Sequence, residues 1–153
     1  MATVYSAQRT NTRANPTVKN KANELAGRVR IAHGTYEASS LASGDVIEMF
    51  VLPDHARIIQ GFLANDALGS STTLSVGYGA YNNSAGTAVA ASAAAYLAAT
   101  STASAARTAI AATLALGSGT EVDANANGLP VTVTLGGATA SGTIELTILY
   151  AVD

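Results

Sequence analysis

The feature that most constrains this fold is a strict alternation of apolar and polar residues within short segments. It is clearest in residues 73–80, 130–135 and 143–151. A period of two places the apolar side chains on one face of a β-strand. Residues typical of turns separate these segments, at positions 43–45, 53–55, 125–128 and 136–137. The pattern therefore predicts an antiparallel sheet structure and disfavours helices alternating with parallel strands.

Further segments of strand length are expected at residues 28–36, 46–52 and 56–65. Within the last of these, Gly61 indicates either a β-bulge or a close approach of another backbone. A short strand is also possible at 120–123. Seven or eight short strands at close spacing predict an all-β fold, an antiparallel β-sandwich of the jelly-roll type.

The alanine-rich middle of the chain is harder to interpret. Val89, Ala93, Tyr96 and Leu97 have the spacing of one helix face, and Ser84 or Thr87 could cap its start. We therefore expect one helical insertion near residues 88–99. Residues 108–116 alternate and are predicted as a strand. A helix is the alternative there, because alanine is the strongest helix former.

Charge divides the chain into two parts. Residues 1–30 carry six basic residues and one acidic residue, a charge of +5, whereas residues 31–153 carry two basic and nine acidic residues, a charge of −7. Residues 1–27 show no strand or helix period, and Pro16 interrupts them. We predict an extended basic N-terminal arm, residues 1–27, followed by a sandwich domain, residues 28–153.

The arm has three possible roles: it lies on an acidic protein surface, it binds nucleic acid, or it is a frayed terminus. Its charges are dispersed and only Tyr5 could stack on a base, so nucleic acid is disfavoured. The residues expected to contact a capsid or a neighbouring copy are Tyr5, Arg9, Arg13, Lys19 and Lys21. The arm also lacks the apolar core of a signal peptide, so we expect synthesis in a cytoplasm and no membrane association.

No constellation of residues indicates catalysis. The chain has no cysteine, which excludes thiol and Cys-ligated metal chemistry, and it has no G-x-S-x-G or phosphate-loop motif. Its two histidines, His33 and His55, could form a metal site only by converging with Asp45, Asp54 or Asp66, and their spacing gives no reason for that. We expect no enzyme activity, no cofactor and no metal; a small hydrolase using both histidines is a remote alternative.

Three tyrosines allow a different function. Tyr78, Tyr81 and Tyr96 could line a sugar-binding surface, although Tyr78 shares a strand face with Leu74 and Val76, which favours a core position. A carbohydrate-binding sandwich therefore stays open beside a purely structural role.

The low charge content favours an assembly subunit. Only 12% of the residues are charged, and Gly, Ala, Ser and Thr make up about half of the chain. A soluble monomer of this size normally carries about twice that share of charge. The composition suits a surface that neighbouring molecules cover.

Several segments resemble the head decoration, or cement, proteins of tailed bacteriophages. These are residues 36–47 (YEASSLASGDVI), residues 52–58 with their Leu-Pro and Ala-Arg-Ile, residues 66–77 (DALGSSTTLSVG) and residues 138–144 (ATASGTI). The resemblance covers roughly residues 35–80 and 129–151. It implies a jelly roll on the outer capsid surface, bound to the major capsid protein and commonly trimeric, without catalytic residues. A tail or neck module is the alternative within phage particles.

Overall fold

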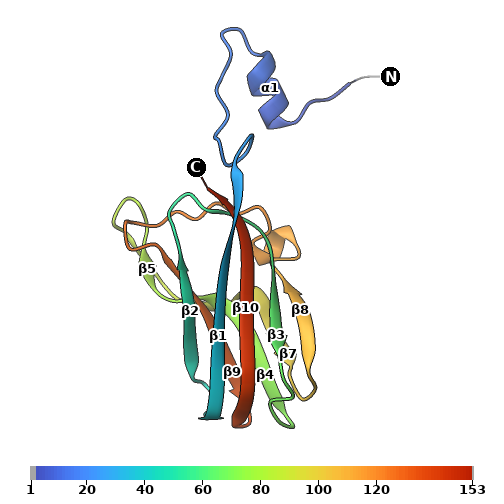
Figure 1. The fold of residues 1–153 in the computed structure, drawn as a ribbon. Helices are drawn as coiled ribbons and strands as arrows, with labels where there is room; N and C mark the ends of the chain where they lie inside the picture. Colours follow the sequence, from blue (N-terminus) through green and yellow to red (C-terminus); the bar gives the residue numbers. More distant parts are fainter. Residues whose placement is uncertain (1–2, 153) are drawn as a thin grey trace.

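Two antiparallel four-stranded sheets pack face to face in the computed structural model, which describes residues 3–152 (Figure 1). A short helix, α1 (Ala7–Arg13), precedes them, and a 3₁₀ turn, η1 (Leu114–Leu116), lies near one end. The strands are β1 (Arg28–Leu41), β2 (Val46–Leu52), β3 (Arg57–Asn65), β4 (Thr72–Tyr78), β5 (Tyr81–Asn82), β6 (Ala88–Val89), β7 (Ser92–Ser101), β8 (Ala106–Ile110), β9 (Leu129–Gly137) and β10 (Ala140–Val152).

The strand order is that of a jelly roll. The first sheet runs β1-β10-β3-β8 and the second runs β2-β9-β4-β7, while β5 and β6 form a separate two-stranded ribbon. Without the ribbon, eight strands remain, and the first pairs with the last, the second with the seventh, the third with the sixth, and the fourth with the fifth. One long hairpin has thus folded over into two sheets. The predicted all-β antiparallel sandwich is confirmed.

The core lies between the two sheets and follows the alternation in the sequence. Leu, Ile and Val supply most of its volume, because branched side chains pack well on a pleated surface. Its fully buried members include Leu52, Ile58, Leu63, Leu74, Val76, Ile110, Val131, Val133, Leu135, Ile144, Leu146 and Ile148. Burial of such apolar area, at about 25 cal/mol per Å², is the main force that holds the sheets together.

Gly61 marks a close approach, one of the two possibilities that its position in the sequence left open. A Cβ atom at Gly61 would lie 2.5 Å from the carbonyl oxygen of Thr147 and 2.8 Å from Cγ1 of Ile110. Because no other residue lacks a Cβ, only glycine lets β3 pass between β10 and the Ile110 side chain.

The helix predicted near residues 88–99 is wrong. Residues 88–89 form β6 and residues 92–101 form β7, an edge strand that pairs with β4. Irregularities in that pairing allow the adjacent residues Tyr96 and Leu97 both to be buried, so the apolar residues lose the period of two and imitate a helix stripe. Pairing with β4 overrides the helix propensity of alanine.

The strand predicted at 108–116 is shorter and begins earlier. β8 ends at Ile110, and Ala111 adopts a left-handed backbone conformation, with φ of 49°. Residues 114–116 then form the 3₁₀ turn η1, capped by the Thr113 side chain. The helical alternative is therefore realised only as this single turn.

The sequence led us to expect an extended arm, but the arm contains a short helix. Residues 7–13 form α1, whose N-cap is Ser6; its Oγ accepts a hydrogen bond from the amide of Arg9 at 3.3 Å. Side-chain capping, rather than an apolar face, accounts for this helix, and for that reason hydrophobic periodicity did not reveal it. Within residues 3–152, no helix is long and apolar enough to cross a membrane.

Candidate functional site

The arm projects beyond the end of the sandwich that carries the C-terminal strand end (Figure 1). None of the α1 residues is buried. The arm folds back on itself, because Nδ2 of Asn11 donates to Oδ1 of Asn20 at 3.0 Å and the amide of Val18 donates to the carbonyl of Asn11 at 3.1 Å. Its local shape therefore depends on polar contacts.

The five arm residues singled out from the sequence fall into two groups. Tyr5, Arg9, Arg13 and Lys19 are exposed in the outer part of the arm. The Arg13 guanidinium lies 4.7 Å from the centre of the Tyr5 ring, a cation–π contact that brings these two together. Lys21 lies apart from them, at the base of the arm, where it contacts the sandwich.

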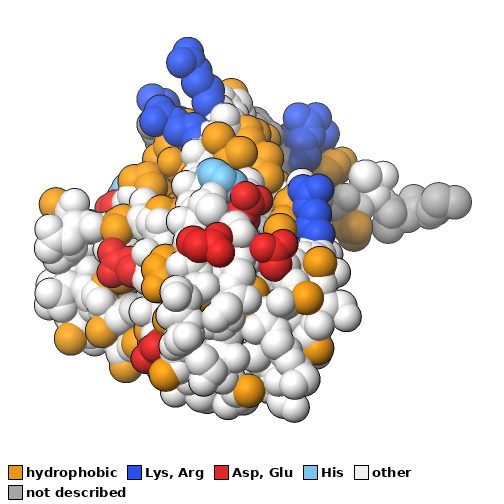
Figure 2. Space-filling model, turned by 60° about the horizontal axis from the view of Figure 1, so that its bottom comes forward, with side chains coloured by type: hydrophobic (Ala, Val, Ile, Leu, Met, Phe, Trp, Pro, Cys, Tyr) orange, Lys and Arg blue, Asp and Glu red, His pale blue; other side chains and the backbone are white. Residues whose placement is uncertain are grey.

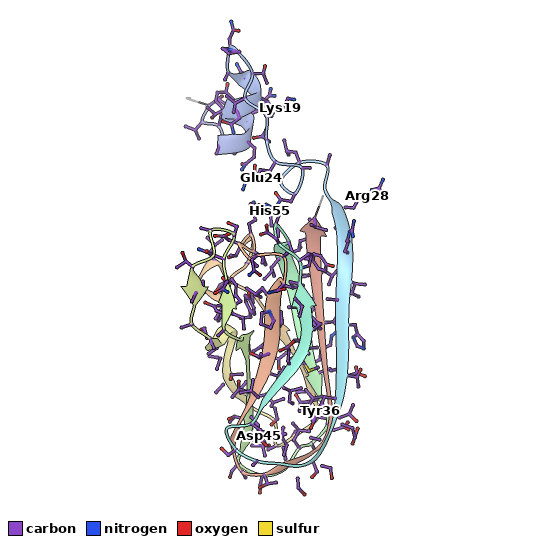
Figure 3. All side chains as sticks on the ribbon, turned by 90° about the vertical axis from the view of Figure 1, so that its left-hand side faces the viewer. Lys19, Glu24, Arg28, Tyr36, Asp45 and His55 are labelled. Atoms are coloured by element: carbon purple, nitrogen blue, oxygen red, sulfur yellow. The ribbon has the colours of Figure 1, made fainter. Side chains whose placement is uncertain are left out.

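Five charged or titratable residues join the base of the arm to the sandwich. At their centre, the Glu121 carboxylate accepts hydrogen bonds from Nζ of Lys21 at 2.8 Å, Nδ1 of His55 at 2.9 Å and Nη2 of Arg57 at 3.0 Å. Glu24, also from the arm, lies 3.5 Å from the Arg57 guanidinium. We call these residues, Lys21, Glu24, His55, Arg57 and Glu121, the anchor cluster (Figure 3 labels Glu24 and His55).

Two hydrogen bonds to backbone carbonyls reinforce the anchor cluster. Asn23 is 7% exposed, and its Nδ2 donates to the carbonyl of His55 at 2.8 Å. Arg57 uses its second terminal nitrogen to donate to the carbonyl of Gly119 at 2.6 Å. The base of the arm is thus held by both ion pairs and hydrogen bonds, whereas residues 3–20 extend past it.

The anchor cluster changes the acidity of its members. The hydrogen bond from Lys21, aided by His55 and Arg57, lowers the pKa of Glu121 to about 2. The same carboxylate, followed by Asp54, raises the pKa of His55 above its ordinary value of 6.5. Glu121 therefore stays ionised over a wide pH range and continues to bind its cations.

Most of the anchor cluster could not be predicted from the sequence. Glu121 lies 100 positions from Lys21 and 66 from His55, and no motif in the surrounding sequence links it to either. The sequence predicts an arm contact for Lys21 and offers His55 as a metal candidate, but it assigns no role to Glu24, Arg57 or Glu121. The jelly-roll connections bring the start of β3 and the segment around Glu121 together, where the backbones of Arg57 and Glu121 form an isolated antiparallel bridge.

The two histidines are not brought together. His33, on β1, contacts the Thr147 hydroxyl at 2.9 Å and the Thr35 hydroxyl at 3.2 Å, whereas His55 belongs to the anchor cluster. Of the carboxylates considered beside them, Asp54 alone contacts a histidine, with its Oδ2 at 3.3 Å from Nε2 of His55. All three accept backbone hydrogen bonds: Asp45 from Ala42, Asp54 from His55 and Ala124, and Asp66 from Thr143. Among the residues that the structure describes, no three potential ligands gather into a metal site.

The three tyrosines pack against one another. The rings of Tyr78 and Tyr81 meet edge to face at 5.7 Å, and those of Tyr78 and Tyr96 lie 6.1 Å apart. Tyr96 is buried, and that burial raises its pKa. Tyr81 is half-exposed and lines a hollow of about 410 Å³, together with side chains of Glu48, Asn82, Asn125 and Asn127.

Comparison with known proteins identifies related folds. No family model matches the chain, and no curated protein matches it. Two solved structures do: a chain in the capsid of Ralstonia phage GP4, with a TM-score of 0.63 and 23% identity, and a chain in the capsid asymmetric unit of cyanophage Pam1, with a TM-score of 0.60 and 17% identity. Each alignment covers 83% of this chain and 86% of the other. The chain thus has the same fold as these two capsid-derived chains.

Proposed function

We propose that this protein is a structural component of a phage virion, which binds the outside of the capsid as a homotrimer and cements neighbouring major capsid subunits. The observation that carries the proposal is the shared sandwich: both matching chains come from structures of phage capsids. The segments that resemble head decoration proteins, the low charge content and the projecting basic arm support the same assignment. The proposal requires no catalysis and no cofactor.

The cementing mechanism follows from linkage. A protein that binds only the assembled, expanded shell stabilises that shell in proportion to its occupancy. Each copy needs only a modest affinity for two adjacent capsid subunits, because many copies act together. A rigid sandwich with an arm suits this task, since the sandwich can rest on one capsid subunit while the arm contacts an adjacent capsid subunit or a neighbouring copy of this chain.

The part of the arm beyond the anchor cluster, residues 3–20, is called the outer arm, and it supplies the electrostatic part of the contact. Arg9, Arg13 and Lys19 are exposed and carry three positive charges with no acidic residue before Glu24. Such charges attract an acidic protein surface, and salt screens that attraction with a Debye length of about 10 Å at 0.1 M. Lys21 already pairs with Glu121, so its role in the contact is to fix the base of the arm.

Co-sedimentation with capsids lacking this protein tests the proposal. We expect the full chain to sediment with the capsids, and the triple variant R9Q/R13Q/K19Q to bind at least tenfold more weakly and with less dependence on salt. The matched control is Arg107→Gln, which removes an exposed positive charge from the sandwich instead. Equal binding by all three proteins would show that the arm charges play no part, and absence of binding by the full chain would refute the proposal itself.

A second function, carbohydrate binding, is favoured by one observation. The hollow beside Tyr81 combines an aromatic ring, three amide side chains and the Glu48 carboxylate, groups that bind sugar hydroxyls and apolar sugar faces. A glycan array distinguishes the two functions. Glycan binding that disappears in Tyr81→Ala would support carbohydrate binding, and an array without hits would exclude it and leave the cement role as the remaining proposal. The array does not separate a head protein from a tail or neck module; the position of the chain on the particle does.

A further inference from the structure

Exposed apolar side chains occur in the arm and on the sandwich, where Val46 and Val51 of β2 and Leu114 of η1 are exposed as well as residues of β1. Four of them lie in the arm: Val4, Tyr5, Val18 and Leu25. On the sandwich, the two most exposed within strands are Ile31 (65%) and Val29 (61%), both on β1. Large apolar groups left in water at this exposure indicate a surface that another molecule covers.

The strand register places these β1 residues on the outer face of the first sheet. Ala32 pairs with the buried Ile148, so it faces the core, and its neighbour Ile31 pairs with Leu149 on the opposite, outer side. Leu149 pairs in turn with Gln60 of β3, next to the exposed Ile59. An apolar band therefore crosses the outer face of β1, β10 and β3 near the arm end.

Carboxylates occupy the other end of the same face. Glu37 on β1 and Glu145 on β10 continue the outward alternation, and Asp66 follows directly after β3. The Thr143 backbone amide and hydroxyl bond to Asp66 and Glu37, which holds the acidic groups close together. One positive charge is nearby, that of Arg107, which stacks on the Phe62 ring at 4.1 Å.

The face thus carries an apolar band followed by an acidic band. Figure 2 shows hydrophobic side chains between the Lys and Arg groups of the arm end and a group of Asp and Glu side chains nearer the viewer. We define this surface, Val29, Ile31, Ile59, Glu37, Asp66 and Glu145, as the outer face. Its net charge is negative even with Arg107 counted.

The outer arm is complementary to the outer face in both respects. It presents exposed apolar groups, Val4 and Val18 among them, and the three cations Arg9, Arg13 and Lys19. The arm does not cover this face within its own chain, because the anchor cluster directs it away past the end of the sandwich (Figures 1 and 3). Because the outer arm and the outer face are complementary but do not meet within one chain, they are suited to meet between two copies of the chain.

We propose that the outer arm of one copy docks on the outer face of a second copy of this chain, with its cations on the acidic band and its apolar side chains on the apolar band. This inference rests on the proposed arm contacts between neighbouring copies and names the surface that receives them. The contact is heterologous, so it closes into a ring when the rotation permits, as in a trimer.

A charge-swap experiment with the full chain, free of capsids, tests the docking. The arm-reversed variant R9E/R13E/K19E and the face-reversed variant E37K/E145K are each expected to self-associate at least tenfold more weakly than the wild type in analytical ultracentrifugation. An equimolar mixture of the two is expected to regain part of the association, because the reversed arm of one variant meets the reversed face of the other, and the unchanged arm meets the unchanged face. A closed ring of three keeps one contact between like variants, so recovery is incomplete. Circular dichroism of each variant confirms that the sandwich is folded.

A matched pair of apolar substitutions provides a second readout. Ile31→Asp removes an apolar group from the outer face and is expected to weaken association, whereas Leu114→Asp, at an 87% exposed position outside it, is not. The docking is overturned if the wild type is monomeric throughout, if the mixture stays dissociated, or if both Asp variants behave alike. Since no capsid is present, loss of capsid binding alone leaves this result unchanged, and the two proposals can fail separately.

Discussion

The sandwich and the arm are built on opposite principles. The sandwich buries a continuous core of branched apolar side chains, whereas no residue of α1 is buried and the arm is shaped by hydrogen bonds between polar groups. Folding stability should therefore reside almost entirely in the sandwich, and the arm gains its full order from whatever it binds. The two parts depend on each other at the anchor cluster and at the adjoining contact between Asn23 and His55.

The largest expected effect comes from the core. Leu146→Ala removes a fully buried side chain of β10 and should lower the free energy of unfolding by about 2–5 kcal/mol, because it leaves a cavity between the sheets. Deletion of residues 1–20, which removes the outer arm, should change the free energy of unfolding by less than about 0.5 kcal/mol. Urea unfolding measures both, and an equal loss in the two variants would contradict the division between sandwich and arm.

A smaller effect is expected where strands approach closely. Gly61→Ala forces a methyl group against the Thr147 carbonyl and the Ile110 side chain, and overpacking of this kind costs about 1–3 kcal/mol. In Gly79→Ala the added Cβ would meet the Pro130 side chain at 3.3 Å, and the cost should be lower. If the two substitutions destabilise the protein equally in urea, the close approach at Gly61 is not the reason for glycine there.

Glu121→Gln tests the joint between the two parts. The substitution removes the charge that Lys21, His55 and Arg57 share, so the base of the arm should detach while the core stays intact. Trypsin cleavage after Lys19 and Lys21 should become several-fold faster, whereas the urea midpoint should move only slightly. Glu48→Gln, which removes an exposed carboxylate from β2 in the other sheet, serves as the control and should leave the cleavage rate unchanged.

The smallest effect concerns pH. Glu121 has a lowered pKa, so its contribution to stability is present above its unfolded value of 4.5 and is lost as the pH falls towards about 2. His55 has a raised pKa, so its contribution is present below 6.5 and is lost as the pH rises through the higher folded value. The anchor should therefore be strongest between about pH 4.5 and 6.5.

Tryptic susceptibility is a poor readout across this range, so amide hydrogen exchange at residues 21–26, corrected for intrinsic rates, is preferable. Wild-type protection should decrease between pH 6 and pH 8, and His55→Gln should abolish that decrease. A pH dependence that persists in His55→Gln would assign the effect to another group.

The sequence predicted the sandwich because its strands follow a simple periodicity. Residues 46–52 form β2 as expected, and the first–last pairing of strands explains why segments such as 143–151 had to be buried on one side. The prediction failed at residues 88–99, where bulges in an edge strand removed the period of two and alanine suggested a helix. Periodicity identifies regular strands and does not identify irregular ones.

The candidate site was less predictable. The basic character of the arm was visible in composition, yet α1 depends on a single capping serine. The anchor depends on Glu121, which lies 100 positions from Lys21 in the sequence and meets it only in the folded chain. Such contacts are set by topology, so no local pattern could indicate them. The sequence therefore suggested which residues of the arm face outward, but not which residues hold the arm in place.

Electron cryomicroscopy of purified phage particles that contain this chain tests the central claim most directly. The account predicts jelly-roll density in many copies on the outer surface of the head, with each arm extending from one copy to its neighbour across a junction between major capsid subunits. Density for this chain only in the tail or neck, only inside the head, or on the head without contact across subunit junctions would contradict the cement function.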